Sequence, residues 1–169
     1  FFTISDNKLK VASEFDFETK NSYAIRIIVS DNAGRTFEKE FTIQINDVNE
    51  APFVAAEMEN KTALTGVLFS YAVPVNTFGD PEDDILSYYA ILTNGNSLPA
   101  WLTFNSSSFA FVGTPEATDI GTYQIKVIAQ DTDGLAGSCE FTLTVLDGSQ
   151  VYLNVSNTEL SVNASGSNT

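Results

Sequence analysis

Apolar and polar residues alternate along much of this chain, with the two-residue period of a β-strand that buries one face. In residues 23–29 every second residue from Tyr23 onward is apolar, and the same holds for residues 41–45 from Phe41 onward. Residues 30–35 between them are rich in Asp, Asn and Gly, which favour a tight turn. The pattern therefore predicts a hairpin of two antiparallel strands.

This hairpin pattern occurs twice, at residue numbers that differ by 100. Nine positions recur with the same spacing: Tyr23, Ile25, Ile27, Asp31, Gly34, Phe41, Thr42, Ile43 and Ile45 correspond to Tyr123, Ile125, Val127, Asp131, Gly134, Phe141, Thr142, Leu143 and Val145. An internal repeat of this length indicates an array of modules. A repeated module usually serves as a spacer, a binding element or an adhesive element.

Further short strands are predicted at residues 9–12, 68–73, 86–92, 101–104 and 109–112, with turns at 94–96 and 113–115. Residues 53–146 then hold about seven strands, enough for a complete β-sandwich. Residues 1–49 supply only the later half of such a module. A new alternation begins in the last segment, at Val151, Leu153, Val155, Leu160 and Val162. We expect three parts, residues 1–52, 53–146 and 147–169, within a longer polypeptide.

The composition restricts the class of partner. The chain carries 22 acidic and 8 basic residues, a formal charge of -14, which repels nucleic acid and anionic membrane surfaces and attracts cations. Hydrophobic residues make up 43% and include 13 Phe, far too many for a disordered acidic tail. No apolar run is long enough to span a membrane, so we expect no membrane insertion of this segment. Because of its negative charge, we expect no nucleic-acid partner either.

Catalysis has little support in the sequence. The chain has no His, which removes Ser-His and Cys-His nucleophile pairs, and it has no phosphate-cradling glycine loop. A pair of carboxylates could in principle cleave a glycosidic bond, although no cleft is evident. The single Cys139 allows no disulfide within the chain and is most simply a small buried residue. We expect that this segment is not an enzyme.

Acidic residues gather in three short runs. The runs are Asp16-Phe17-Glu18, Asp47-Val48-Asn49-Glu50-Ala51-Pro52 and Asp80-Pro81-Glu82-Asp83-Asp84. Carboxylates this close repel one another unless a cation lies between them, and calcium takes about 6–8 oxygen ligands from such mixed sets. The alternative for any one run is solvated surface charge. For Asp83 and Asp84 we favour that alternative, because Asp after Pro is common in turns for its local hydrogen bonds.

The same residues carry a family resemblance. Residues 2–4 (Phe-Thr-Ile), 16–18, Asp31 and 47–52 resemble the later half of a cadherin repeat, in the shortened linker form typical of bacterial cadherin-like repeats. Residues 77–83, 98–104 and 113–115 make 53–146 resemble a dystroglycan-type cadherin-like domain, and 151–169 resemble the first strands of a BACON domain. The resemblance implies an all-β fold of tandem Greek-key β-sandwiches of cadherin or immunoglobulin type, the first and last incomplete.

In the cadherin family, calcium lies at the junction between successive repeats. The resemblance implies that the junction near residues 47–52 uses eight ligand residues: Asp16, Glu18, Asp47, Asn49 and Glu50 from the first module, and Asp80, Glu82 and Asp131 from the second. By the same logic Asp31 would serve an upstream junction.

The repeat offset provides an internal control. One hundred residues after 16–18 come Glu116-Ala117-Thr118, and residues 147–150 read Asp-Gly-Ser-Gln. The second junction has lost most of its carboxylates, so we expect one calcium cluster near residues 47–52, none near 147–150, and a more mobile hinge at the latter.

Two functions remain open at the level of sequence. The first is a calcium-stiffened stalk or binding segment of a large bacterial cell-surface or secreted protein, in contact with adjacent domains of the same chain and with surface glycans or other surface proteins. The second is an accessory glycan-binding module of a secreted polysaccharide-degrading enzyme, for which Trp101 could stack on a sugar. A lone Trp in an alternating apolar run is more often a core residue, and we expect Trp101 to be structural. Both functions imply an extracellular location.

Overall fold

The described part of the chain folds into β-strands joined by turns, with short 3-10 helices at Ala117–Asp119 and Gly148–Gln150. The computed structural model describes residues 1–150, 152–154 and 161–163. Contacts divide the chain into a first unit, Phe1–Glu50, and a second unit, Ala51–Thr169. The predicted all-β fold class is confirmed. Among the described residues, no helix has the length and apolarity needed to cross a membrane.

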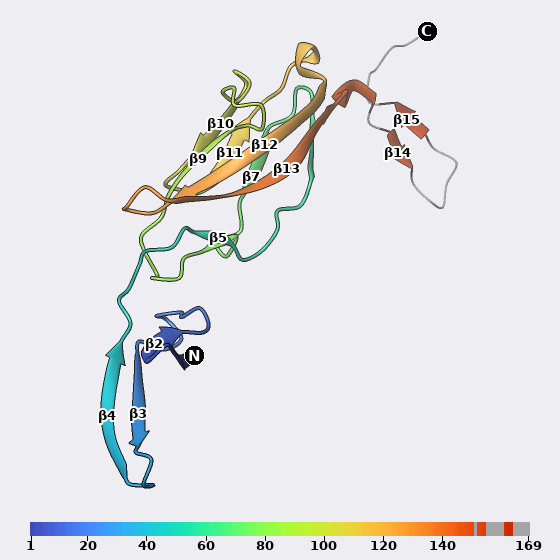
Figure 1. Ribbon diagram of the computed structural model, residues 1–169. Helices are drawn as coiled ribbons and strands as arrows, with labels where there is room; N and C mark the ends of the chain where they lie inside the picture. Colours follow the sequence, from blue (N-terminus) through green and yellow to red (C-terminus); the bar gives the residue numbers. More distant parts are fainter. Residues whose placement is uncertain (151, 155–160, 164–169) are drawn as a thin grey trace. The chain divides into compact units, whose positions relative to one another are not determined.

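Two sheets make up the body of the second unit (Figure 1). One sheet has the order β10-β11-β7, with β10 at Leu102–Asn105, β11 at Ala110–Gly113 and β7 at Phe69–Ala72. The other has the order β6-β13-β12-β9, with β6 at Lys61–Leu64, β13 at Ala136–Leu146, β12 at Gly121–Gln130 and β9 at Ser87–Leu92. A small third pair joins β5 (Phe53–Val54) to β8 (Phe78–Gly79).

The core lies between these two sheets and is made by the alternating residues that the pattern placed on one face. Ile125, Val127 and Leu143 have no exposed surface, and burying each side chain contributes roughly 1.5–3 kcal/mol. The aromatic rings join the sheets directly. The ring centroid of Phe141 on β13 lies 5.5 Å from those of Tyr71 on β7 and Phe111 on β11.

One strand of the larger sheet has no signal in the sequence. β6 pairs in parallel with the end of β13, in the register Leu143↔Lys61 to Leu146↔Leu64. Ala63 is the one buried residue of β6, so the segment has neither the alternation nor the bulk that marks a strand. Its neighbour β13 supplies the backbone partners that hold it in place.

The first unit consists of two hairpins. β1 (Phe2–Ser5) pairs with β2 (Lys8–Val11), and β3 (Ser22–Ser30) pairs with β4 (Thr36–Gln44), the long blue and cyan hairpin of Figure 1. Asp6 and Asn7 join β1 to β2 with φ of 55° and 57°, the left-handed pair that a two-residue hairpin turn requires. Tyr23 is the single buried residue of this unit, packed among three rings at 5.0–5.7 Å: Phe1, Phe2 and Phe15.

The hairpin turn is the same in both units. The Oδ1 atom of Asp31 accepts a hydrogen bond from the amide of Arg35 at 2.9 Å, and Oδ1 of Asp131 accepts one from the amide of Leu135 at 2.8 Å. The glycine before the last turn residue has φ of 78° in the first unit and 92° in the second, which glycine adopts without strain. The repeated Asp and Gly therefore build the turn itself.

The last part of the chain contains one further strand pair, β14 (Tyr152–Asn154) with β15 (Ser161–Asn163). The predicted alternation there includes Val151, Val155 and Leu160, which lie outside the described residues. The prediction that residues 147–169 begin a further domain stays a prediction.

The repeat provides a direct test of the core. Phe141 is 3% exposed, whereas its counterpart Phe41 is 39% exposed. We expect Phe141→Ala to lower the free energy of unfolding of the second unit by about 3–5 kcal/mol, and Phe41→Ala to cost the first unit clearly less. Amide hydrogen exchange in β12 and β3 would measure each unit separately, and equal losses in the two units would contradict this account.

Candidate metal-binding site

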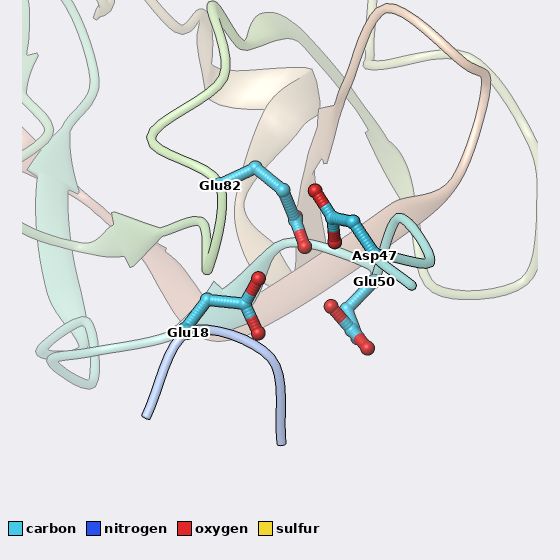
Figure 2. A group of neighbouring side chains, drawn as sticks. All are labelled: Glu18, Asp47, Glu50 and Glu82. Atoms are coloured by element: carbon cyan, nitrogen blue, oxygen red, sulfur yellow. The ribbon is translucent and has the colours of Figure 1, made fainter. Parts of the chain in front are cut away.

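Three carboxylates converge in the first unit (Figure 2). Glu18 lies in the loop before β3, and Asp47 and Glu50 follow the end of β4. One carboxylate oxygen from each residue lies within 4.8 Å of the others. Figure 2 also labels Glu82, which belongs to the second unit. All three side chains of the first unit are exposed, so solvent and ions can reach them.

This arrangement favours a cation. Two unit charges about 4 Å apart repel by about 1 kcal/mol in bulk water and by more near a protein surface. A hard divalent ion would turn that repulsion into attraction, because calcium accepts carboxylate oxygens from several directions. The three oxygens could supply part of such a shell.

The carboxylate of Asp16 accepts two local hydrogen bonds. Its Oδ1 atom accepts from the amide of Thr19 at 3.0 Å, and its Oδ2 atom accepts from the Thr19 hydroxyl at 2.8 Å. These bonds, the hydroxyl foremost, lower the pKa of Asp16 below its ordinary value. Asp16 is therefore held as a carboxylate at the start of the loop that presents Glu18. The partner Thr19 was not singled out from the sequence, although the Asp-x-x-Thr spacing is that of a local cap.

Asn49 lies within the linker between Asp47 and Glu50. Its Nδ2 atom donates to the backbone carbonyl of Glu50 at 3.3 Å, so its amide helps to shape this short segment. The structure thus brings Glu18, Asp47 and Glu50 together and gives Asp16 and Asn49 local contacts beside them.

In the second unit, the loop after β8 holds Asp80 in an unusual state. Asp80 is 9% exposed, and its Oδ1 atom accepts hydrogen bonds from the amides of Glu82 and Asp84, both at 3.1 Å. Its Oδ2 atom is buried and has no hydrogen-bond partner among the described residues. A buried carboxylate oxygen without a partner is costly, and a bound cation is one way to satisfy it.

Asp131 approaches the same loop from the turn after β12. It is 6% exposed, and the neighbouring Thr132 hydroxyl donates to Oδ2 of Asp84 at 3.3 Å. This contact joins the turn to the loop that carries Asp80 and Glu82, so the three ligand candidates of the second unit lie in one region. The side chain of Asp84 thus accepts a hydrogen bond from a distant segment, whereas we expected a local one within its own turn.

The two copies of the turn differ in what accompanies the aspartate. In the first unit the Nε atom of Arg35 donates to Oδ2 of Asp31 at 2.7 Å, and hydrogen bonds from Arg35 lower the pKa of Asp31. In the second unit the corresponding residue is Leu135, which offers no charge to Asp131. The first turn therefore has a positively charged side chain, Arg35, where the second turn has an uncharged one.

The segment 147–149 is held by short hydrogen bonds, one of them to Thr65. Oδ1 of Asp147 accepts from the amide of Ser149 at 2.9 Å, and the amide of Gly148 donates to the hydroxyl of Thr65 at 2.9 Å. Within the residues that the structure describes, no group of three or more acidic ligands forms there. The more mobile hinge that we expected at this junction stays a prediction.

Known proteins share this architecture. The sequence profile of a family described as "Putative Ig domain" (He_PIG) matches residues 51–146. Mouse cadherin-23 EC22-24 is similar with a TM-score of 0.53 and 19% identity, over 86% of this chain and 49% of that chain. Protocadherin gamma B7 extracellular cadherin domains 1-4 gives 0.54 and 15%, over 94% and 42%. At these identities the similarity shows the fold.

A further similarity involves an enzyme. The endo-fucoidan hydrolase MfFcnA4 from glycoside hydrolase family 107 has a TM-score of 0.48 and 19% identity, over 80% of this chain and 20% of that chain. The chain thus spans about half or less of the length of each of these three proteins.

The hydrogen bonds of Asp16 predict a pH response. Because Thr19 lowers the folded pKa of Asp16, this interaction stabilises the fold above the unfolded pKa of 3.8 and is lost as the pH falls through the folded value. We expect Thr19→Val to move the pKa of Asp16 upward, toward 3.8. Carboxyl-detected NMR titration would measure the change, with Thr42→Val as the control. An unchanged pKa in Thr19→Val would show that the hydrogen bonds are not formed in solution.

Proposed function

This chain belongs to the immunoglobulin-like domain family whose profile matches residues 51–146, and we propose that it is a calcium-stiffened tandem module of a bacterial cell-surface or secreted protein. In this role it acts as an adhesin stalk or a binding segment. The activity is mechanical: it sets the distance and the angle between neighbouring domains.

The observation that carries the proposal is the buried Oδ2 atom of Asp80, which has no hydrogen-bond partner within the described ranges 1–150, 152–154 and 161–163. Two backbone amides already orient the other oxygen of this carboxylate, so the side chain is held in one position before any ion binds. Fixed oxygens lose little conformational freedom on binding an ion. The converging carboxylates of Glu18, Asp47 and Glu50 give independent support from the first unit.

The proposed ligands come from both units. The first unit contributes carboxylate and amide oxygens from its loop and its linker, and the second contributes them from the loop after β8 and the turn after β12. The set is Asp16, Glu18, Asp47, Asn49, Glu50, Asp80, Glu82 and Asp131. This is the ligand pattern that the resemblance to cadherin repeats implies.

Calcium would stiffen the chain by linking the two units. An ion that binds the ordered arrangement stabilises it by about 2.7 kcal/mol at a hundred times its dissociation constant. Without the ion, two small sandwiches joined by a short linker are expected to move relative to each other. Extracellular calcium would therefore keep the module extended, and a location outside the cell is part of the proposal. A catalytic role is not part of it.

Calcium titration tests the site. We expect isothermal titration calorimetry of the whole chain to show calcium binding that Glu18→Ala with Asp47→Ala abolishes, because two of the three converging carboxylates are then gone. The control is Glu14→Ala with Glu40→Ala, which removes the same charge from two exposed residues outside the group. Heat that is unchanged by the first double variant, or equally reduced by both, would refute the site.

A second variant tests the contribution of the second unit. Asp80→Asn keeps the oxygen that accepts the two amides and removes the charge, so the loop should fold as before. We expect the calcium-induced rise in Tm, measured by calorimetry with and without EDTA, to fall in this variant. An undiminished rise would exclude Asp80 as a ligand.

A second candidate function is glycan binding, and one groove favours it. The groove has a volume of about 410 Å³ and lies beside the edge strand β9, lined by aromatic and hydroxyl side chains that include Tyr88, Tyr89 and Ser97. Tyr89 is 45% exposed, so its ring could stack on a sugar. Trp101 packs edge-on against Phe69, with 6.5 Å between ring centroids, which fits the structural role that we expect for it.

Glycan arrays on the whole chain would separate the two functions. If the groove binds sugars, Tyr89→Ala should weaken binding about fivefold, which corresponds to about 1 kcal/mol for a lost stacking contact, while Tyr89→Phe keeps the ring and the affinity. Equal affinity of Tyr89→Ala and the unaltered chain, or no bound glycan, would remove this candidate.

A further inference from the structure

The strand β9 forms one edge of the larger sheet of the second unit. It pairs with β12 and, in the part of the chain that the structure describes, with no other strand. The opposite edge strand, β6, begins with Lys61, whose Nζ atom lies 2.9 Å from a carboxylate oxygen of Glu59. Charged side chains at an edge discourage pairing with another chain, and β9 has none, since it reads Ser-Tyr-Tyr-Ala-Ile-Leu. One edge of this sheet is therefore protected by charge and the other is not.

The uncharged region extends well beyond β9. Residues 85–115, which include β9, β10 and β11, contain no Asp, Glu, Lys or Arg, so all 22 acidic and 8 basic residues lie outside this range. On the sheet face that carries Tyr89, Lys126 and Glu140 offset each other in an ion pair, with 3.1 Å between Nζ and Oε1. A chain of formal charge -14 repels a second copy wherever acidic residues would meet. The uncharged edge is where two copies can approach without that repulsion.

The backbone of β9 directs every second residue away from β12. The amide of Thr93 donates to the carbonyl of Gln124 on β12 at 2.9 Å. Because the residues of an antiparallel strand alternate in direction, odd-numbered residues of β9 exchange hydrogen bonds with β12 and even-numbered residues face the other way. Leu92 follows this rule, since its amide donates to the carbonyl of Asn96 in the turn at 2.9 Å.

Tyr88 and Ala90 are the other two outward-directed residues of β9, and no further strand of the described residues pairs with them. A groove of about 410 Å³ follows this edge, lined by the consecutive residues 88–91. The other residues that line the groove are also uncharged: Ser97, Leu98, Phe104 and Ser106. The edge thus combines outward backbone groups with an uncharged hollow, the arrangement that accepts an added strand.

A second copy of the same strand fits this edge in one symmetric register. In an antiparallel pair about a twofold axis, outward-directed residues lie opposite each other, so Tyr88 of each copy meets Ala90 of the other. Tyr89 then lies opposite the Tyr89 of the second copy, in a pair without hydrogen bonds whose Cα atoms are about 4.5 Å apart. Tyr89 is 45% exposed and available for this contact, and aromatic pairs across strands stabilise a sheet. The strand is therefore complementary to itself in backbone and in side chains.

We propose that two copies of this chain associate by pairing their β9 strands antiparallel, with Tyr89 at the twofold axis. The two four-stranded sheets then form one continuous sheet across the axis. The occupant of the edge is a second copy because the contact needs an uncharged strand on both sides, and this chain supplies one. The interaction uses no residue of the proposed calcium site and connects neighbouring molecules side by side. A sugar in the same groove would compete with it.

The association state of the whole chain provides the test. We expect analytical ultracentrifugation to show a monomer–dimer equilibrium, measured in EDTA so that the outcome does not depend on calcium. Tyr89→Lys and Tyr89→Glu should each weaken dimerisation at least about tenfold, because like charges then face each other across the axis. An equimolar mixture of the two variants should restore dimerisation as a heterodimer, because the facing charges are then opposite.

Matched controls separate strand pairing from a general effect of charge. Val75 is 90% exposed and lies between β7 and β8, so Val75→Lys and Val75→Glu, alone or mixed, should leave dimerisation unchanged. A backbone variant tests the register. Ala90→Pro removes an outward amide and no hydrogen bond to β12, so it should abolish dimerisation while the unit stays folded, as amide exchange in β12 would verify.

Two results would overturn the proposal. The first is a chain that remains monomeric at about 1 mM, whether or not the groove binds a glycan. The second is a dimer that Tyr89→Lys and Tyr89→Glu leave as tight as that of the parent chain, because the contact would then lie away from β9.

Discussion

The packing of one sheet against the other through the alternating face of the β12–β13 hairpin is the interaction on which the second unit depends. Phe141 meets Tyr71 and Phe111 across the core, and the residues beside it on both strands are sealed from water. The larger sheet of the unit is built outward from this hairpin. β9 and β6 pair with its two edges, and the turn at its tip presents Asp131.

The turn at the tip of this hairpin positions the acidic residues Asp131 and Asp80 of the second unit. Asp131 forms the turn through its own hydrogen bond to Leu135, and Thr132 ties the turn to the loop that holds Asp80. The fold thus fixes one oxygen of Asp80 and buries the other, which has no partner in the part of the chain that the structure describes, a state that bound calcium could relieve. In the first unit the equivalent Asp31 is instead satisfied by Arg35. The two copies of this aspartate therefore differ in the side chain beside them, Arg35 in the first unit and Leu135 in the second.

The two units also show that an apolar pattern specifies a face without specifying what covers it. The hairpins β3–β4 and β12–β13 have the same register and the same turn, yet only the second is buried. Burial depends on a second sheet that the hairpin itself cannot encode.

The sequence by itself determined most of the strands, the two long hairpins and the all-β class, because each follows from side chains two to five positions apart. Comparison of positions 100 residues apart added the repeat. The period-2 alternation and the Asp and Gly of the turns act locally. Convergence of Glu18, Asp47 and Glu50, and the parallel strand β6 at Lys61–Leu64, were decided by the tertiary structure. The burial of the Asp80 Oδ2 atom was decided there too, because it depends on which distant segments close over the loop, and no local pattern records that.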